Sequence, residues 1–507
     1  MDPSLKALRA QVDPYLRELG TLQYRHGAGL PTDTSVHAIR AETPELHRPD
    51  AFEALRDAIG GKMSDDDTPR RMRRLLELVA GEREDVLAAS ASQAVSELEA
   101  RGSVTLGAYG EDALPFHEAI ARLPREGSRE KRAALESGLG RFLWEHSGPY
   151  ARRLEATVRL AEELGAPSYV KLREEVSGFT FAPLVEEGEK ALARTEDAYR
   201  DVLGYVLKKL DATVRPLPSG TGRRHDVQYV SGAPQLARDL RWEDLMPALS
   251  HWLTDFGLTP DAERRIRLDT DRRPGKSPRP FVAAIQVPDE IRLVISPDSG
   301  LAGASAILHE YGHAQHLAHV ERKAPVEDRR LLDASVSEAY ASLFDHLLLD
   351  EAWLRRYLRM PSSLSRETAR LAAFRETMLL RRHAAKLGYE LSLYERGPGE
   401  ELAEEYEERQ RKALGVGVHR GFYLYDVDPK LYAARYLRGW ALEARLHRVL
   451  QERFNEDWWR NPAAGSFLVG LFKRGGRDDA AELANELTGE PPSFEEVCAR
   501  LIRVLGA

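Results

Sequence analysis

The chain has 507 residues, 42% hydrophobic and 30% charged, a composition typical of a globular protein with a large apolar core. Its net charge of −8 argues against a general nucleic-acid-binding protein, which usually has a basic excess. The single cysteine, Cys498, excludes an internal disulfide and a thiolate metal cluster. The N-terminal segment is charged throughout, unlike a signal peptide, and no apolar run is long enough to span a bilayer. We therefore expect a cytoplasmic protein without nucleic-acid or membrane partners.

Residues 1–213 are predicted to form an N-terminal helical domain. Within 71–102 and 184–212, apolar residues recur at three- and four-residue steps with charges between them, as in helices with one buried face. Thr68 and Pro69 have the residue types of a helix N-cap and a first helical position. The Pro/Gly segment VRPLPSGTGRRHD at 214–226 is the best candidate boundary, which places a second domain over 214–507.

Two short strands are predicted in RPFVAAIQVPDEIRLVISP (279–297), joined by a turn at Pro288-Asp289-Glu290. They give nearly the only convincing strand signal in the chain. We therefore expect a mainly α fold with a small β-sheet close to the next segment, AILHEYGHAQHLAHV (306–320), which concentrates four histidines.

A helix over 304–320 would place His309, His313 and His316 on one face and the apolar residues on the other. His309 and His313 lie on adjacent turns, so both rings can bind one zinc ion. Glu310 follows the first histidine and points beside the metal, where it suits a general base for water. This H-E-x-x-H pattern predicts one Zn²⁺ per chain.

A catalytic zinc needs a third protein ligand and an open position. The segment nearly spells H-E-x-x-H-x-x-G-x-x-H, but His316 stands where that motif has glycine. In a continuous helix, His319 then points about 80° away from the other ligands, which argues against it. His316 itself is expected to be a hydrogen-bond partner near the site, since a fourth protein ligand would close it.

Glu338 is the better third ligand. It lies 25 residues after His313, in a second predicted helix, DASVSEAYASLFDHLL. Ala341 and Ser342 beside it are small enough to let this helix approach the metal. Asp345, on the same face, is either a surface acid or a residue that orients a ligand histidine.

These residues resemble the glutamate-zincin metallopeptidases, most closely the thimet oligopeptidase and oligoendopeptidase F family. The similarity extends over residues 265–500 and includes LHEYGHAQH, LDTDRRPGKSPRPFVAAIQ and LYAARYLRGWALEARL. It implies a large helical two-lobed fold around a deep substrate channel, with the small sheet beside the zinc-binding helix. It also implies zinc bound by His309, His313 and Glu338, with Glu310 as the general base.

By the same resemblance, Tyr436 and Tyr432 would hydrogen-bond the oxyanion or the carbonyl of the substrate. The chain departs from the family pattern at Val427, where a histidine is usual, and at Gly439, where a further tyrosine is usual. His419, in the glycine-rich segment GVGVHRGFYLYD (415–426), could replace the missing histidine if that segment folds inward.

The expected function is zinc-dependent hydrolysis of internal bonds in short peptides, with the peptide backbone pairing with the edge of the 281–286 strand. A zinc carboxypeptidase or peptidyl-dipeptidase is an alternative, in which Arg435, Arg438 or Lys276 would hold the free carboxylate of the substrate. A third reading is a peptide-binding protein that holds metal without turnover, although such a protein would have no use for Glu310.

Overall fold

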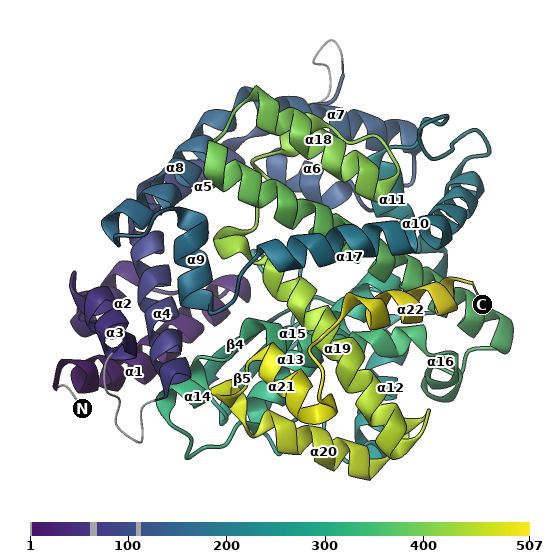
Figure 1. The fold of residues 1–507 in the computed structure, drawn as a ribbon. Coiled ribbons are helices and arrows are strands. Elements are labelled where there is room, and N and C mark those ends of the chain that lie inside the picture. The colour runs from purple at the N-terminus through teal and green to yellow at the C-terminus, as the bar shows by residue number, and fades with distance from the viewer. Residues whose placement is uncertain (1–2, 61–67, 108–112, 507) are drawn as a thin grey trace. The chain divides into compact units, whose positions relative to one another are not determined.

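The computed structural model describes residues 3–60, 68–107 and 113–506. As predicted, the described chain is mainly helical, with two small sheets (Figure 1). In the part of the chain that the structure describes, no helix combines the length and apolar character needed to cross a lipid bilayer. The N-cap predicted at Thr68 is confirmed, because its Oγ1 accepts a hydrogen bond from the Arg71 N–H at the start of a helix at Pro69.

The chain forms two compact units, and each is discontinuous in sequence. The first comprises Met1–Ala80, Gln235–Ala369 and Arg438–Val497, and the second comprises Gly81–Pro234, Arg370–Leu437 and Cys498–Ala507. The expected organisation had one boundary, at 213/214, whereas the segment 214–226 lies inside the second unit. The two-lobed arrangement around a substrate channel stays a prediction.

The first unit holds the larger sheet and its covering helices. Its helices are α1 (Pro3–Gly27), α2 (Val36–Glu42), α3 (Ala51–Gly60), α12 (Trp242–Asp255), α13 (Leu301–His319), α14 (Val326–Arg330), α15 (Ala334–Asp345), α16 (Glu351–Tyr357), α20 (Pro462–Phe472) and α21 (Ala480–Thr488). Its strands are β3 (Ile266–Asp269), β4 (Phe281–Gln286) and β5 (Glu290–Val294).

The second unit is almost entirely helical. Its helices are α5 (Ala89–Arg101), α6 (Phe116–Arg122), α7 (Arg129–Glu145), α8 (Ser147–Glu163), α9 (Tyr169–Ser177), α10 (Ala182–Leu210), α11 (Arg224–Ser231) and α18 (Glu400–Leu414). The strands β1 (Ser103–Thr105) and β2 (Ala113–Pro115) pair antiparallel. The helices α4 (Pro69–Leu87), α17 (Ser362–Arg396), α19 (Ala433–Phe454) and α22 (Phe494–Leu505) contribute residues to both units.

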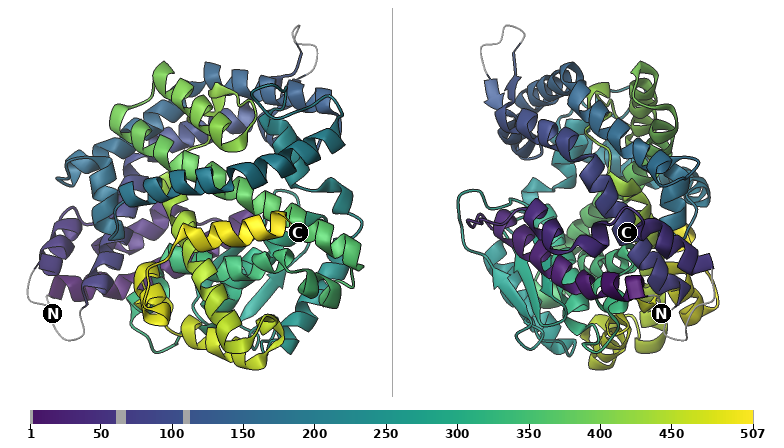
Figure 2. Two further views of the ribbon diagram at one scale, coloured as in Figure 1. Left: turned by 45° about the vertical axis from the view of Figure 1, so that its right-hand side comes forward. Right: turned by 90° about the vertical axis from the view of Figure 1, so that its left-hand side faces the viewer.

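The three-stranded sheet has the order β3-β5-β4. The predicted hairpin is confirmed, since β4 pairs antiparallel with β5 and Ala283 lies opposite Arg292. The strand β3, which the sequence did not predict, pairs parallel with β5 on its other side. Helix α1 runs along β4 (Figure 2), where a Cβ atom added to Gly20 would lie 2.8 Å from the carbonyl oxygen of Ala284. The sheet therefore has α13 beside it and α1 next to its β4 side.

Short 3₁₀ helices connect several of these elements. They lie at Pro44–His47, Pro234–Leu236, His346–Leu349, Arg420–Phe422, Pro429–Leu431, Trp458–Arg460 and Gly475–Arg477. The third of them follows α15 directly, and the fifth leads into α19.

Candidate metal centre

Helix α13 carries the histidine cluster, and its two faces separate as the sequence predicted. Ile307, Leu308, Tyr311 and Ala314 are buried against the core of the first unit. The side chains of His309 and His313 keep 20% and 17% of their surface exposed. The helix therefore leaves part of both imidazoles exposed to solvent, where a metal ion and water can reach them.

Helix α15 lies directly against α13 because a glycine removes the side chain between them. A Cβ atom added to Gly312 would come within 2.5 Å of the Cα atom of Ala341. The small residue expected at position 341 thus makes the close approach possible. The contact brings Glu338, one turn earlier on α15, next to the two histidines.

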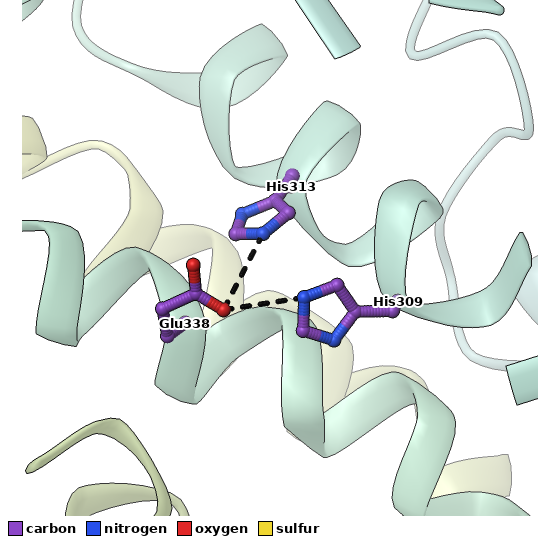
Figure 3. Close-up of side chains that lie close together, drawn as sticks. All are labelled: His309, His313 and Glu338. Carbon is purple, nitrogen blue, oxygen red and sulfur yellow. Dashed lines mark ion pairs between the residues drawn. The ribbon is translucent and has the colours of Figure 1, made fainter. Parts of the chain in front are cut away.

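The three predicted ligands converge (Figure 3). The Oε2 atom of Glu338 lies 3.2 Å from Nε2 of His309 and 3.8 Å from Nε2 of His313. One ligand atom from each residue lies within 4.8 Å of the other two. Two ligand atoms in a tetrahedral zinc site are about 3.3 Å apart. Two neutral imidazole nitrogens and one carboxylate oxygen are also a donor set of catalytic zinc sites, so the residues fit the ion.

The second ring nitrogen of each histidine has a partner of its own. Nδ1 of His313 lies 2.9 Å from Oγ of Ser337, and Nδ1 of His309 lies 3.5 Å from Oδ2 of Asp345. Asp345 also accepts a hydrogen bond from the hydroxyl of Ser305. These contacts turn both Nε2 atoms toward Glu338. Of the two roles left open for Asp345, its position favours the orientation of His309, because its side chain is only 10% exposed.

Burial and neighbouring charges set the protonation of the cluster without metal. Burial lowers the pKa of His313 to about 4, which keeps its ring in the neutral form that binds a metal. Burial alone would lower the pKa of His309, but hydrogen bonds to Asp345 and Glu338 outweigh it and raise that pKa. A cation between His309 and Glu338 would therefore replace a proton.

Glu310 lies beside the ligands rather than among them. Its carboxylate is within hydrogen-bonding reach of the Val282 N–H on β4, and burial raises its pKa to about 7. Its side chain therefore points from the ligand helix toward β4, and its role as a general base stays a prediction.

Helix α19 supports the turn that carries Glu338, and the sequence did not indicate this role. A Cβ atom added to Gly439 would lie 2.8 Å from Cβ of Glu338 and 3.1 Å from the Ser335 carbonyl oxygen. A side chain larger than that of glycine therefore does not fit at this position. Next to it, Arg438 donates hydrogen bonds to Ser335 and Asp479.

The other two histidines of α13 take no part in the ligand group. His316 is fully buried, with its ring 4.8 Å from that of Tyr340, and neither ring nitrogen has a hydrogen-bond partner among the described residues. The hydrogen bond expected there is thus not seen. His319, rejected as a ligand, has its Nδ1 atom 2.8 Å from the Gln315 carbonyl oxygen one turn back.

Tyr432 and Tyr436 belong to the second unit and are neighbours, as their spacing predicted. Their rings lie 5.1 Å apart, and the ring of Tyr436 lies 5.2 Å from that of His383. Their roles toward a substrate stay predictions.

His419 also belongs to the second unit, where its ring occupies the space beside Gly140 of α7. Its Nδ1 atom accepts a hydrogen bond from the Gly421 N–H. Two hydrogen bonds hold the glycine-rich segment 415–426 to other parts of the second unit. The Gly417 N–H donates to the Gly222 carbonyl oxygen, and the Tyr389 hydroxyl donates to the Tyr423 carbonyl oxygen.

Sequence reasoning missed the supporting residues Ser305, Ser337 and Gly439. Ser337 directly precedes Glu338, and the need of a ligand histidine for a second partner could have drawn attention to it. Searches of known protein-family models and of curated proteins found no match to this chain.

Proposed function

We propose that this chain is a zinc-dependent metalloendopeptidase that hydrolyses internal bonds of short peptides, as members of the thimet oligopeptidase and oligoendopeptidase F family do. The observation that carries the proposal is the convergence of His309, His313 and Glu338 within 4.8 Å, with Glu310 next to them on α13. A purely structural metal site has no need of an acid in that position. The single cysteine, Cys498, fits the cytoplasm that we propose as its location.

In this proposal the chain's own residues move the proton. Bound zinc would supply Lewis-acid polarisation of the scissile carbonyl and of water. Glu310 would accept a proton from water and deliver it to the leaving amine. Asp345 and Ser337 would keep the two imidazoles in their ligand orientation. Tyr436 and Tyr432 would donate hydrogen bonds to the substrate carbonyl.

The edge of β4 supports a narrower version of the peptide-pairing hypothesis. Within the described residues, β4 pairs only with β5, so its other side is an edge. Arg330 already donates hydrogen bonds to the carbonyls of Ala284 and Ile285. Of this edge, the start of β4 would remain for an extended peptide, which would have to take the Val282 N–H from Glu310 and to pass α1 beside Phe281.

The carboxypeptidase alternative needs a cation that is available to the substrate's carboxylate. Lys276 donates hydrogen bonds to the Asp269 carboxylate and to three backbone carbonyls. Arg438 is buried beside Asp479 and Asp333. The guanidinium of Arg435 lies 4.9 Å above the ring of Phe179. Each candidate cation has a structural role, so these contacts favour the endopeptidase.

The substitution Glu310→Gln separates hydrolysis from metal binding. A peptide library of mixed lengths is digested with and without a chelator, and the cuts are mapped by mass spectrometry. The wild-type chain and the exposed control Glu401→Gln should cut internal bonds only without chelator. Glu310→Gln should retain zinc and cut about 10²–10⁴-fold more slowly. A Glu310→Gln variant that cuts at the wild-type rate would refute the assignment.

The same digestion distinguishes the alternatives. Cuts confined to one or two residues from free C-termini, and lost on C-terminally amidated peptides, would establish the carboxypeptidase or peptidyl-dipeptidase. No cut in any peptide, despite bound zinc, would favour the protein that binds peptides without turnover.

A further inference from the structure

The second unit contains a polar cavity that shares no residue with the metal centre. Its volume is about 440 Å³, and it lies between α7, α11, α18 and the segment that follows α18. Its charged and hydrogen-bonding lining residues are Glu136, Ser137, Arg223, His225, Glu407, His419 and Arg420. Ionisable groups that line a cavity usually have partners, either within the protein or in a bound ligand.

Glu136 is the buried acid of this cavity. It is only 6% exposed, and its Oε1 atom has no hydrogen-bond partner among the described residues. Burial raises its pKa although His225, Arg224 and Arg223 act in the opposite direction, which reflects the cost of a buried carboxylate whose Oε1 atom has no hydrogen bond. A ligand that donates a hydrogen bond or carries a positive charge would remove this cost.

His225 faces Glu136 across a gap. Its Nε2 atom lies 4.0 Å from Oε2 of Glu136, which is too far for a hydrogen bond. Its Nδ1 atom lies 3.2 Å from Oδ1 of Asp226, and Asp226 is held in turn by Arg129 and Arg132. The Nδ1 side of the imidazole thus faces Asp226 and its Nε2 side faces Glu136. An ammonium group placed between Nε2 and Glu136 would have a partner on each side.

Glu407 also lines the cavity and Arg420 pairs with Glu400 and Glu404, so the groups that favour an anion are Arg223 and His419. Arg223 is exposed, its charge acts on Glu136 from a distance, and no carboxylate within 4.0 Å of its guanidinium is found among the described residues. Because Nδ1 of His419 accepts the Gly421 N–H, its Nε2 atom carries the proton and is a donor. Burial, Arg223, Arg141 and Arg420 all lower the pKa of His419, so positive charge surrounds a neutral donor. Such a group of donors suits a carboxylate.

We propose that this cavity binds a small dipolar molecule, of which a free amino acid is the simplest, with its carboxylate at Arg223 and His419 and its ammonium group at Glu136 and His225. The inference does not depend on the proposed peptidase function. If that function holds, the ligand shares a free ammonium group and a free carboxylate with the peptide products.

Thermal unfolding of the full chain tests this inference. Glutamate, lysine and leucine are titrated separately to about 10 mM, which saturates a millimolar site. Acetate, ethylammonium and inorganic phosphate are titrated as probes that carry charge of one sign only. A chelator is present throughout, so that no amino acid can bind through zinc. At least one amino acid should raise the unfolding temperature saturably, whereas acetate and ethylammonium should not.

Matched variants assign the effect to the cavity. Glu136→Gln and Arg223→Ser should each weaken amino-acid binding by about tenfold or more. Their exposed controls, Glu130→Gln and Arg125→Ser, should bind as the wild type does. The inference is overturned if no amino acid stabilises the chain, if phosphate or acetate alone stabilises it equally, or if both cavity variants bind normally. Arg223 is exposed, so its variant should fold even if Glu136→Gln does not.

Discussion

Each histidine of the metal centre uses its two ring nitrogens differently. Nε2 points to Glu338, while Nδ1 contacts Ser337 in one case and Asp345 in the other. A ring held at one nitrogen loses little freedom when the other binds a metal, so these contacts prepare the site before the ion arrives. Ser337 and Asp345 therefore help to form the metal centre by holding its ligand histidines in place.

Replacing Asp345 by asparagine should weaken zinc binding about 10–100-fold, because the negative partner of His309 is lost. Competition with a chromophoric chelator measures the change. The exposed acid Asp239, substituted in the same way, should leave the affinity unaltered. Equal affinities of Asp345→Asn and the wild-type chain would show that Asp345 does not orient His309.

At the scale of elements, close helix packing sets the position of Glu338. Gly312 brings α15 against α13, and Gly439 brings α19 against the turn of α15 that holds Glu338. Both glycines work by leaving out a side chain where backbone atoms of a neighbour come within about 3 Å, a distance that a Cβ atom does not tolerate. The position of one ligand thus depends on three helices.

Gly439→Ala tests this packing. Its new Cβ atom would collide with Glu338, so we expect a loss of about 1–3 kcal/mol in the free energy of unfolding and weaker zinc binding. Gly470→Ala, on the open side of α20, should instead raise the free energy of unfolding by about 0.5–1 kcal/mol. Chemical denaturation and zinc competition measure both variants. A stable Gly439→Ala variant with normal zinc affinity would disprove the packing argument.

How much could be predicted also differs by element. The period of apolar residues and the polar face predicted α13 and α15, which the structure places at Leu301–His319 and Ala334–Asp345. The hairpin β4–β5 has alternating residues and a turn, and was also predicted. The strand β3 was missed because IRLD is only four residues long and two of them are charged. Its pairing with β5 is a tertiary contact that no local pattern records.

Side-chain contacts within one helix could also be predicted, whereas contacts between distant segments could not. Spacing within one helix predicted that His309 and His313 would be neighbours, and the small residues beside Glu338 indicated a close approach. The place of Gly439 could not be predicted, because it contacts a residue 101 positions earlier in the chain. His316 shares the histidine face of α13, yet the ring of Tyr340 covers it, and only the packing of α15 reveals this.

At the scale of the whole molecule, the chain crosses several times between its two units. Proline and glycine mark loops, and the segment at 214–226 is a loop up to Arg223, where α11 follows within the same unit. Residues 3–27 pack against β4 in the first unit although hundreds of residues separate them. Non-local contacts of this kind leave no signal in a local pattern.

The free energy of unfolding should depend on pH through one buried acid of the first unit, Asp478. Asp478 is 4% exposed, and burial raises its pKa to about 6 despite its hydrogen bond from Arg474. Because its native pKa lies above its unfolded value, the native state favours the protonated form. The stability that the native state gains by keeping Asp478 protonated is present at acidic pH and is lost as the pH rises through about 6.

Asp478→Asn should therefore gain stability relative to the wild type as the pH increases. The difference in free energy of unfolding between the two chains should grow by about 1 kcal/mol from pH 5 to pH 8. Urea denaturation at both pH values measures it, with Asp239→Asn as the exposed control. A difference that is constant with pH, or that shrinks, would contradict the assignment to Asp478.

Zinc binding to the metal-free full chain tests the central claim most directly. Calorimetric titration of wild-type protein should give one zinc ion per chain, and saturating zinc should raise the unfolding temperature, because the ion binds the native state. Glu338→Gln should lose the high-affinity site, while the exposed control Glu401→Gln should retain it. A wild-type chain that binds no zinc, or a Glu338→Gln chain that binds it as tightly as the wild type, would contradict the account.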